Sequence, residues 1–256
     1  MTGHVRRRRA ATPDELARIH WLQELTPDHR VWAAQRVLVH NLEPQDMLCI
    51  YGDHPTHWFG TLQGLLKLSN DSPDGRPITY AGLPTSGWFG EGTLIKQEPY
   101  RYNVSALRAS TVGSLPIAAF HHLLEVSLEF NRYLMAQINE RLGQFMAARV
   151  TDRTRNPEIR VARSLMALFN PVLYPTVDAF FQITQQELAY LIGIPRQRIN
   201  EALQQLASKR VVELGYGGVR VIDSDLLAHI GQQKDTSRLG SDAGGEPRPT
   251  DGGQRG

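Results

Sequence analysis

The spacing of apolar residues along the chain changes twice, and these changes divide it into three parts. Between residues 37 and 116, short apolar runs alternate with turn residues. Strands that recur about every 8–12 residues, with glycine, aspartate and proline between them, favour a compact antiparallel barrel or jelly roll. The runs expected to form strands are 46–51, 64–69, 78–83, 101–107 and 111–115. Residues 13–36 precede them and read as one or two short helices, because acidic Asp14 and Glu15 suit a first turn.

A helical spacing begins at Pro116 and continues to about residue 150. Its apolar residues recur at steps of three, four and six positions: Leu124, Leu128, Leu134, Ile138, Leu142 and Phe145. A single helix of roughly 30 residues is longer than a small domain needs, so we expect part of this stripe to pack against a second copy of the chain. The alternative is that the stripe only covers the barrel. The expected homodimer interface consists of Leu134, Ile138, Leu142 and Phe145.

The third part contains two predicted helices joined by a glycine turn. Thr184 suits a helix N-cap, and Glu187 three residues later completes a capping box. Gly193 suits the left-handed position that ends a helix, and Pro195 suits the start of the next one. Two β runs, 211–214 and 219–222, then flank a glycine-rich turn and predict a hairpin. Together these features predict a winged helix-turn-helix, with an ordinary helical hairpin and β-ribbon as the alternative.

Basic and amide side chains gather at the start of the second of these helices. An arginine can form two hydrogen bonds with a guanine edge, and glutamine or asparagine can do the same with adenine. We therefore predict that this segment binds double-stranded DNA at a palindromic operator. The predicted contact residues are Thr184, Gln185, Arg196, Gln197, Arg198, Asn200 and Tyr216.

The composition narrows the class of protein further. The net charge is only +2, so a DNA-binding face must be local. A single cysteine, Cys49, excludes an intramolecular disulfide and a four-cysteine iron–sulfur or zinc site. No apolar run is long enough to span a membrane and none follows the N-terminal arginines, so we expect a cytoplasmic protein. Residues 1–12 and 231–256 read as disordered tails, the first of which could instead be an arm that contacts phosphates.

Several segments resemble, in their order and spacing, the cyclic-AMP-receptor and fumarate-nitrate-regulator (CRP/FNR) family of transcription factors. The segments are 64–69, 74–76, Phe-Gly-Glu within 87–91, Leu-Pro at 115–116, and 183–200. The resemblance covers about residues 20–230 and implies an α+β fold. It implies a double-stranded β-roll of the cyclic-nucleotide-binding type with N-terminal helices at 13–118, a dimerisation helix at 119–150 and a winged helix-turn-helix at 156–230. RNA polymerase is a further partner that the resemblance allows.

The resemblance also implies an effector pocket in the roll, and this pocket departs from the family pattern. In cyclic-nucleotide-binding members, a Phe-Gly-Glu segment binds the ribose, and an Arg-Ser pair ten residues later holds the phosphate. Here Tyr102 takes the serine position, and Phe145 and Met146 replace two hydroxyl residues that contact the base. Polar groups of a ligand lose affinity when they meet apolar side chains. The expected pocket residues are Gly90, Glu91, Arg101, Tyr102, Phe145 and Met146.

These departures favour another small-molecule effector or none, so no cofactor is assigned. A regulator that responds to cyclic AMP or cyclic GMP is the alternative. Glu91 and Arg101 could also form a structural ion pair within the roll. In the recognition segment, Pro195, Gln197 and Glu201 differ from residues common in the family, so an operator sequence is not carried over.

Proteins of other classes also use β-rolls, but the motifs of this chain do not favour them. A metal-dependent roll enzyme needs several convergent histidines and a carboxylate, and the sequence has no His-x-His motif of that spacing. It also lacks a Gly-x-Ser-x-Gly elbow and a phosphate-binding loop, so we predict that it is not an enzyme. Histidine pairs at 54/57 and 121/122 leave a haem sensor without specific support. The predicted winged helix argues against a cyclic-nucleotide module that does not bind DNA.

Overall fold

Short helices open the chain and pack on the end of a β-roll. The computed structural model describes residues 8–71, 77–151, 154–177 and 180–233. The hydroxyl of Thr12 accepts a hydrogen bond from the amide of Glu15, and the amide of Thr12 donates one to the carboxylate of Glu15, which completes a capping box. The helices that follow are α1 (Pro13–Ala17), α2 (His20–Glu24) and α3 (Pro27–Ala34).

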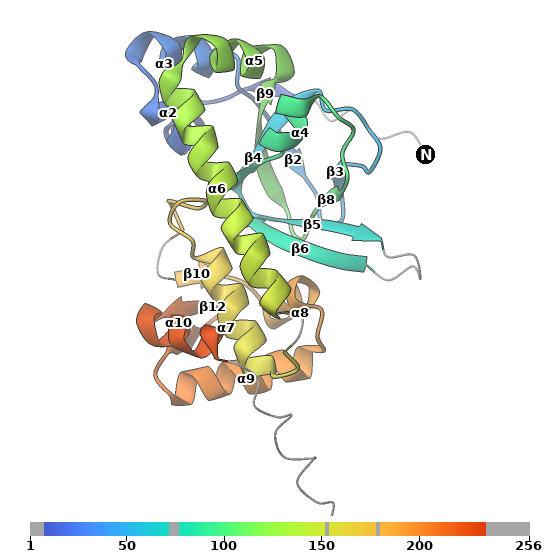
Figure 1. Ribbon diagram of the computed structural model, residues 1–256, viewed down its shortest axis with the longest axis vertical. Helices are drawn as coiled ribbons and strands as arrows, with labels where there is room; N and C mark the ends of the chain where they lie inside the picture. Colours follow the sequence, from blue (N-terminus) through green and yellow to red (C-terminus); the bar gives the residue numbers. More distant parts are fainter. Residues whose placement is uncertain (1–7, 72–76, 152–153, 178–179, 234–256) are drawn as a thin grey trace, which may run out of the picture.

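Two antiparallel sheets form the roll (Figure 1). One sheet has the order β1-β2-β9-β4-β7, with strands β1 (Arg9–Ala10), β2 (Leu38–Leu42), β4 (His57–Gln63), β7 (Trp88–Phe89) and β9 (Ser110–Pro116). The other has the order β3-β8-β5-β6, with strands β3 (Met47–Cys49), β5 (Leu65–Asp71), β6 (Pro77–Pro84) and β8 (Asn103–Ala106). A short helix, α4 (Glu91–Lys96), follows β7 and carries the first candidate effector residues. The expected roll is therefore confirmed, including strands at all five predicted runs.

Three tryptophans form the centre of the core of the roll. The ring centroid of Trp21 on α2 is 5.3 Å from that of Trp58 and 5.3 Å from that of Trp88. The ring centroids of Trp58 and Trp88 are 4.6 Å apart. Phe130 packs edge-on against Trp21 and Trp58. Gly60 must be glycine here, because a Cβ would lie 2.3 Å from the ring of Trp88. Aromatic packing of this kind fixes the N-terminal helices and the following long helix on the same sheet.

The expected single long helix is wrong in one respect: the chain breaks it at Ser127. The two helices are α5 (Ile117–Val126) and α6 (Leu128–Thr151). Ser127 is extended, with φ −118° and ψ 110°, and its hydroxyl accepts a hydrogen bond from the amide of Phe130 at 3.2 Å. The side-chain amide of Asn131 donates to the carbonyls of Leu124 and Ser127. Side chains thus cap both ends of the break, and α6 runs as a separate helix along the roll toward the second domain.

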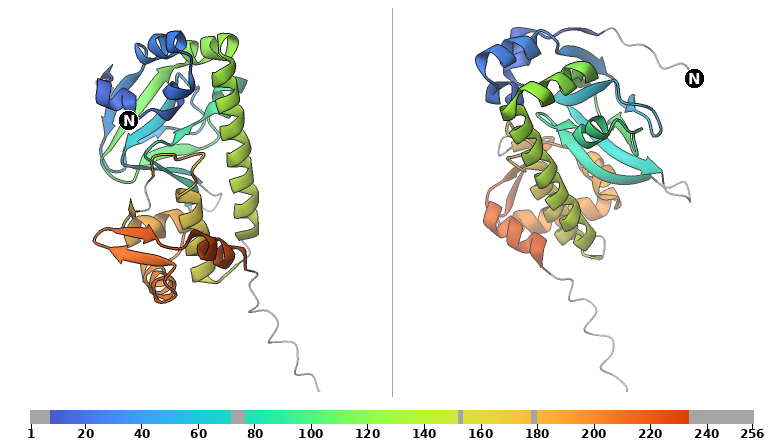
Figure 2. Two further views of the ribbon diagram at one scale, coloured as in Figure 1. Left: turned by 90° about the vertical axis from the view of Figure 1, so that its left-hand side faces the viewer. Right: turned by 45° about the horizontal axis from the view of Figure 1, so that its top comes forward.

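A smaller domain follows α6 and has its own sheet and helical core. Its helices are α7 (Pro157–Leu168), α8 (Gln185–Ile192), α9 (Arg196–Ser208) and α10 (Ser224–Gln232). Its strands, in the order β10-β12-β11, are β10 (Phe180–Gln182), β11 (Val212–Gly215) and β12 (Gly218–Val221). Figure 2 shows α6 running beside both domains. None of the described helices is long and apolar enough to cross a membrane.

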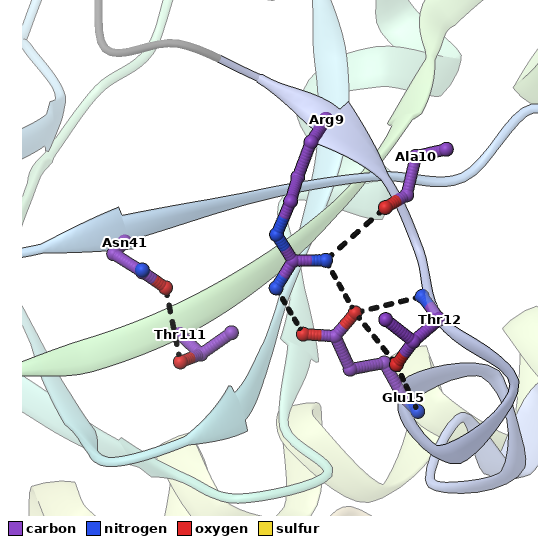
Figure 3. Close-up of polar contacts among 6 residues, drawn as sticks. All are labelled: Arg9, Ala10, Thr12, Glu15, Asn41 and Thr111. Carbon is purple, nitrogen blue, oxygen red and sulfur yellow. Dashed lines mark hydrogen bonds and ion pairs between the residues drawn. The ribbon is translucent and has the colours of Figure 1, made fainter.

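The expected N-terminal tail is partly ordered. Arg9 pairs with Val39 and Ala10 with Leu38 in the sheet. The guanidinium of Arg9 donates two hydrogen bonds, of 2.7 and 2.5 Å, to the carboxylate of Glu15 (Figure 3). This contact holds the pKa of Glu15 down at about 2. The first domain therefore begins before the expected residue 13, because β1 belongs to its sheet. Helix α10 extends the second domain beyond residue 230. Residues 1–7, 74–76 and 234–256 of the segments discussed above lie outside the described residues.

The two domains pack directly on one another. Leu65 of the roll is fully buried in the same apolar cluster as Leu165, Leu188 and Ile199 of the second domain. The hydroxyl of Tyr174 donates to the carbonyl of Gly82 at 3.1 Å, and Thr79 donates to the carbonyl of Tyr190 at 2.9 Å. The roll is thus in contact with the helices that we predicted to bind DNA.

Candidate nucleic-acid interface and effector pocket

Local signals place the two helices of the candidate DNA-binding segment. Thr184 and Glu187 form the predicted capping box at the start of α8. Gly193 ends α8 in the left-handed region, with φ 70°, as the sequence predicted. Arg108 of the roll lies 3.6 Å from the carboxylate of Glu187, so an ion pair from the first domain reaches this cap.

Helix α9 is amphipathic, with one apolar face and one polar face. Ile199 and Leu203 are buried in the domain core. The side chains expected to contact DNA leave the opposite face and are exposed to solvent: Arg196, Gln197, Arg198 and Asn200. The amide of Gln185 on α8 donates to Asn200 at 2.9 Å, which links the two helices beside this face. The polar face is therefore accessible on an otherwise packed helix.

Glu201 holds two of the predicted contact residues in the DNA-free protein. Its carboxylate accepts hydrogen bonds from Gln197 and from Arg198, both at 3.3 Å. Arg196 makes no ion pair with any described residue. The sequence analysis noted Glu201 only as a departure from the family, although its spacing of three and four residues from these partners is that of neighbours on a helix.

The predicted wing is also present. Strands β11 and β12 pair through Leu214 with Val219 and Gly215 with Gly218, and Tyr216 at the tip is fully exposed. Gly217 has φ 70°. A Cβ on Gly218 would lie 2.5 Å from the ring of Phe180, so a glycine is required for the hairpin to cover β10.

The candidate effector pocket contains a buried carboxylate with an unexpected partner. The side chain of Glu91 is only 4% exposed, and its Oε1 lies 3.0 Å from Nε of Arg141 on α6. A second nitrogen of Arg141 donates to the carbonyl of Trp88 at 2.7 Å. Burial opposes the charged form of Arg141, but the adjacent Glu91 carboxylate outweighs it and raises the pKa of Arg141. An arginine of this chain thus lies where the resemblance implied a ligand.

Arg101 is not a partner of Glu91. Its side chain is 76% exposed and pairs with Glu98 at 2.8 Å. The expected Glu91–Arg101 ion pair within the roll is therefore wrong, and Glu91 pairs with Arg141 of α6 instead. Spacing along the chain aligned Arg101 with the family, whereas Arg141 reaches Glu91 only because α6 folds back across the roll. No local sequence signal would have revealed Arg141.

The remaining pocket candidates are divided between two places. Tyr102 lies inside the roll, where its hydroxyl is 3.4 Å from that of Thr93 and burial raises its pKa. A Cβ on Gly90, which has φ 89°, would lie 3.2 Å from the same hydroxyl. Phe145 and Met146 are 42% and 66% exposed on α6, so neither covers the buried Glu91 carboxylate within this chain.

The apolar stripe on α6 also divides into two groups. Leu134 is 2% exposed in the core of its own chain, so its assignment to a dimer interface needs correction. Ile138, Leu142 and Phe145 are 39%, 56% and 42% exposed. Met135 and Met146 extend this exposed face and were not included in the predicted set. The inward turn at Leu134 follows from contact between the first turns of α6 and helix α2.

The cysteine and histidines do not converge on a metal site. Within the described ranges, no group of three or more histidine, cysteine or acidic side chains could hold a metal ion. Cys49 is buried, and burial raises its pKa. Burial lowers the pKa of His57 to about 4, and its ring bonds to Arg8. His57 is therefore a neutral structural residue of the roll near neutral pH.

Comparisons with known proteins agree with this architecture. The cyclic nucleotide-binding domain family matches residues 39–127, and the Crp-like helix-turn-helix domain family matches residues 159–230. The transcriptional regulator SdrP of Thermus thermophilus is 24% identical over 182 residues, which cover 70% of this chain and 86% of SdrP. The cyclic AMP receptor protein of the same organism is 29% identical over 202 residues, which cover 74% and 86% of the two chains.

Solved structures show the same fold. FixK2 of Bradyrhizobium japonicum superposes with a TM-score of 0.64 at 14% identity, over 77% of this chain and 98% of FixK2. A CRP/FNR-family transcriptional regulator of Thermus thermophilus has a TM-score of 0.51 at 20% identity, over 76% and 98%. A roll of the cyclic-nucleotide-binding type joined to a winged helix-turn-helix defines a DNA-binding transcription regulator and not an enzyme. The chain belongs to the CRP/FNR family.

Proposed function

We propose that this regulator acts as a homodimer that inserts α9 of each subunit into successive major grooves of a palindromic operator. The observation that carries the proposal is the exposed polar face of α9, set on a buried apolar face and preceded by a capped α8. A two-fold dimer places two such helices on one side of the duplex, about one helical turn apart. Tyr216 at the tip of the wing is placed to contact the adjacent backbone.

Arg196 and Gln197 are the proposed base-reading residues, and Arg198 contacts either a base or the backbone. Arg196 is available without breaking an ion pair to a described residue, whereas Gln197 and Arg198 must leave Glu201. Thr184, Gln185 and Asn200 lie beside this face at the start of α8 and on α9, where they suit contacts with phosphates or a neighbouring base. Not all three residues at 196–198 can point into the groove, because they lie on different sides of the first turn.

Replacement of Arg196 and Arg198 by alanine tests this proposal. An arginine that reads guanine should cost about 1–3 kcal/mol when removed and relax specificity at one position per half-site. An arginine that binds phosphate should weaken binding to all sequences and reduce the slope of affinity against salt by about one per lost contact. Mobility shifts on selected operators at two salt concentrations distinguish the two roles. Arg18→Ala, an exposed arginine of the roll, is the control. Unchanged affinity and specificity in the double variant would exclude α9 as the reading helix.

Dimerisation is proposed through the exposed face of α6. Met135, Ile138, Leu142, Phe145 and Met146 are all at least 39% exposed, and a run of apolar side chains of this size on one helix is typical of a protein contact. RNA polymerase is a further proposed partner of the DNA-bound dimer. Within a cell we expect it in the cytoplasm, where its operator DNA lies.

We propose that the roll does not use cyclic AMP or cyclic GMP as its effector. One oxygen of the Glu91 carboxylate, which would hold a ribose, is engaged by Arg141, and a buried ion pair is costly to break. Tyr102 fills the position beside it with a large aromatic ring. An effector, if the regulator uses one, is therefore expected to differ chemically from a cyclic nucleotide.

A further inference from the structure

The structure contains a cavity at the junction of its two domains. Its volume is about 460 Å³, within the range of about 300–1,000 Å³ typical of small-molecule sites. Strands β5 and β6 of the roll, α6, and helices α7, α8 and α10 of the DNA-binding domain all contribute to its walls. The cavity thus contacts each of the three parts of the chain.

Much of the cavity lining is apolar. Tyr80 comes from the roll, Phe145 from α6, and Met166 and Leu168 from α7. Tyr80 and Phe145 are 42% and 42% exposed, so part of their ring surface is available. Surfaces of this kind favour the aliphatic or aromatic body of a ligand.

The charged side chains in the lining are mostly cations. Arg141, Arg160 and Arg163 face one carboxylate, Glu140. Glu140 accepts a hydrogen bond from Asn170 at 2.6 Å, and Arg141 is paired with Glu91. The described lining therefore holds more basic than acidic side chains, next to an apolar surface.

Arg163 is the cation whose hydrogen bonding is incomplete. Its Nε donates to the carbonyl of Gly231 and a terminal nitrogen donates to Gln233. Its other terminal nitrogen, Nη1, is buried and has no hydrogen-bond acceptor among the residues described. Burial lowers the pKa of Arg163. A buried donor left without an acceptor is unfavourable, and more so when the group is charged.

We propose that this interdomain cavity binds an amphipathic anion, with its carboxylate or phosphate beside Arg163 and its apolar body against Tyr80 and Met166. An anion beside this guanidinium supplies a countercharge that Arg163 lacks among the described residues. The apolar body removes ring and thioether surface from water. A cation is excluded by the arginines, and a neutral ligand of the same shape leaves Arg163 unsatisfied.

Binding of such a ligand is expected to change the affinity for DNA. This coupling is the one part of the inference that rests on the proposed function. The cavity is bordered by contacts that join the domains: Thr79 with Tyr190 and Tyr174 with Gly82. Leu191 and Ile192 line the cavity at the end of α8, directly before the turn into α9. A ligand that contacts both domains shifts their relative position by its difference in affinity between arrangements.

Calorimetry on the DNA-free protein tests the site, using octanoate, octyl phosphate and the uncharged 1-octanol as probes. We expect at least one of the anions to bind at least tenfold more tightly than the alcohol. Arg163→Met should abolish that preference, while Arg18→Met, at an exposed arginine, should retain it. The relative affinity of the two anions distinguishes a carboxylate ligand from a phosphate ligand.

A cavity-filling variant locates the binding. Gly143 lines the cavity, and a Cβ there meets no atom within 4 Å, so Gly143→Leu adds a side chain in open space. We expect at least tenfold weaker binding of the preferred anion. Gly92→Leu, at another glycine with open space, is the matched control. No binding of either anion, equal binding of the alcohol, or unchanged binding in both Arg163→Met and Gly143→Leu would each overturn the proposal. Because no DNA is present, such a failure leaves the proposed DNA-binding role intact.

Discussion

Arg141 is the residue that most changes the interpretation of the roll. A buried carboxylate needs a partner of opposite charge, and in this chain the partner comes from α6 instead of a ligand. Arg101, the residue that sequence alignment favoured, remains in solvent with Glu98. A connection between the roll and α6 is thus made by the chain itself.

We expect Arg141→Met to destabilise the protein by about 3–5 kcal/mol, because it leaves the Glu91 carboxylate buried without a countercharge. Urea unfolding at neutral pH measures the change. The double variant Arg141→Met/Glu91→Gln should recover part of the loss, since neither charge then remains buried. Arg101→Met is the control, and removal of its exposed pair should cost no more than about 1 kcal/mol. Equal effects of Arg141→Met and Arg101→Met on the free energy of unfolding would show that the buried pair stabilises the protein no more than the exposed pair does.

At the scale of helices and strands, residues that act within one turn of helix predicted element ends correctly. The spacing of apolar residues did not predict every break or every strand. Thr184, Glu187 and Gly193 act within a single turn of helix, so their roles could be predicted without knowing the fold. The break at Ser127 was missed, because apolar residues continue at helical steps on both sides of it. Strands β2, β4 and β7 were also missed as individual elements.

Residues whose role depends on distant contacts could not be predicted in the same way. Leu134 has the same spacing as Ile138 and Leu142, yet it is buried against its own chain. Only the docking of α6 on the roll distinguishes them. The same reason explains why Arg141 was absent from the predicted pocket and Arg101 was included in it.

The exposed face of α6 gives a prediction about assembly. Ile138→Glu combined with Leu142→Glu should convert the homodimer to monomers, because charges placed in an apolar interface lose hydration without gaining a partner. Light scattering at micromolar protein concentration measures the molecular mass. Val31→Glu, on an exposed apolar side chain of α3, should leave the dimer unchanged. A wild-type protein that is already monomeric would contradict the proposed interface.

The two domains are in close contact, and Gly82 lies at one point of close approach. A Cβ there would lie 2.9 Å from Leu191 and 3.0 Å from Leu168 of the DNA-binding domain. The carbonyl of the same residue accepts the hydrogen bond from Tyr174. The position of the winged helix relative to the roll therefore depends on one glycine having no side chain.

We expect Gly82→Ala to destabilise the interdomain contact by about 1–3 kcal/mol, since the neighbouring leucines must move to admit the methyl group. Calorimetric unfolding should then broaden or separate into two transitions, one for each domain. Gly92→Ala adds the same methyl group in open space and should leave the unfolding profile unchanged. An identical profile for the wild type and both variants would show that the domains do not depend on this contact.

The aromatic core of the roll has a spectroscopic consequence. All four tryptophans of the chain, Trp21, Trp32, Trp58 and Trp88, lie in the first domain, and the DNA-binding domain has none. Trp21, Trp58 and Trp88 are shielded from solvent, so their emission should be shifted to the blue in the folded protein. Tryptophan fluorescence, excited selectively over tyrosine, is therefore an optical reporter of the first domain, and a tryptophan introduced at Tyr216 would report on the wing separately.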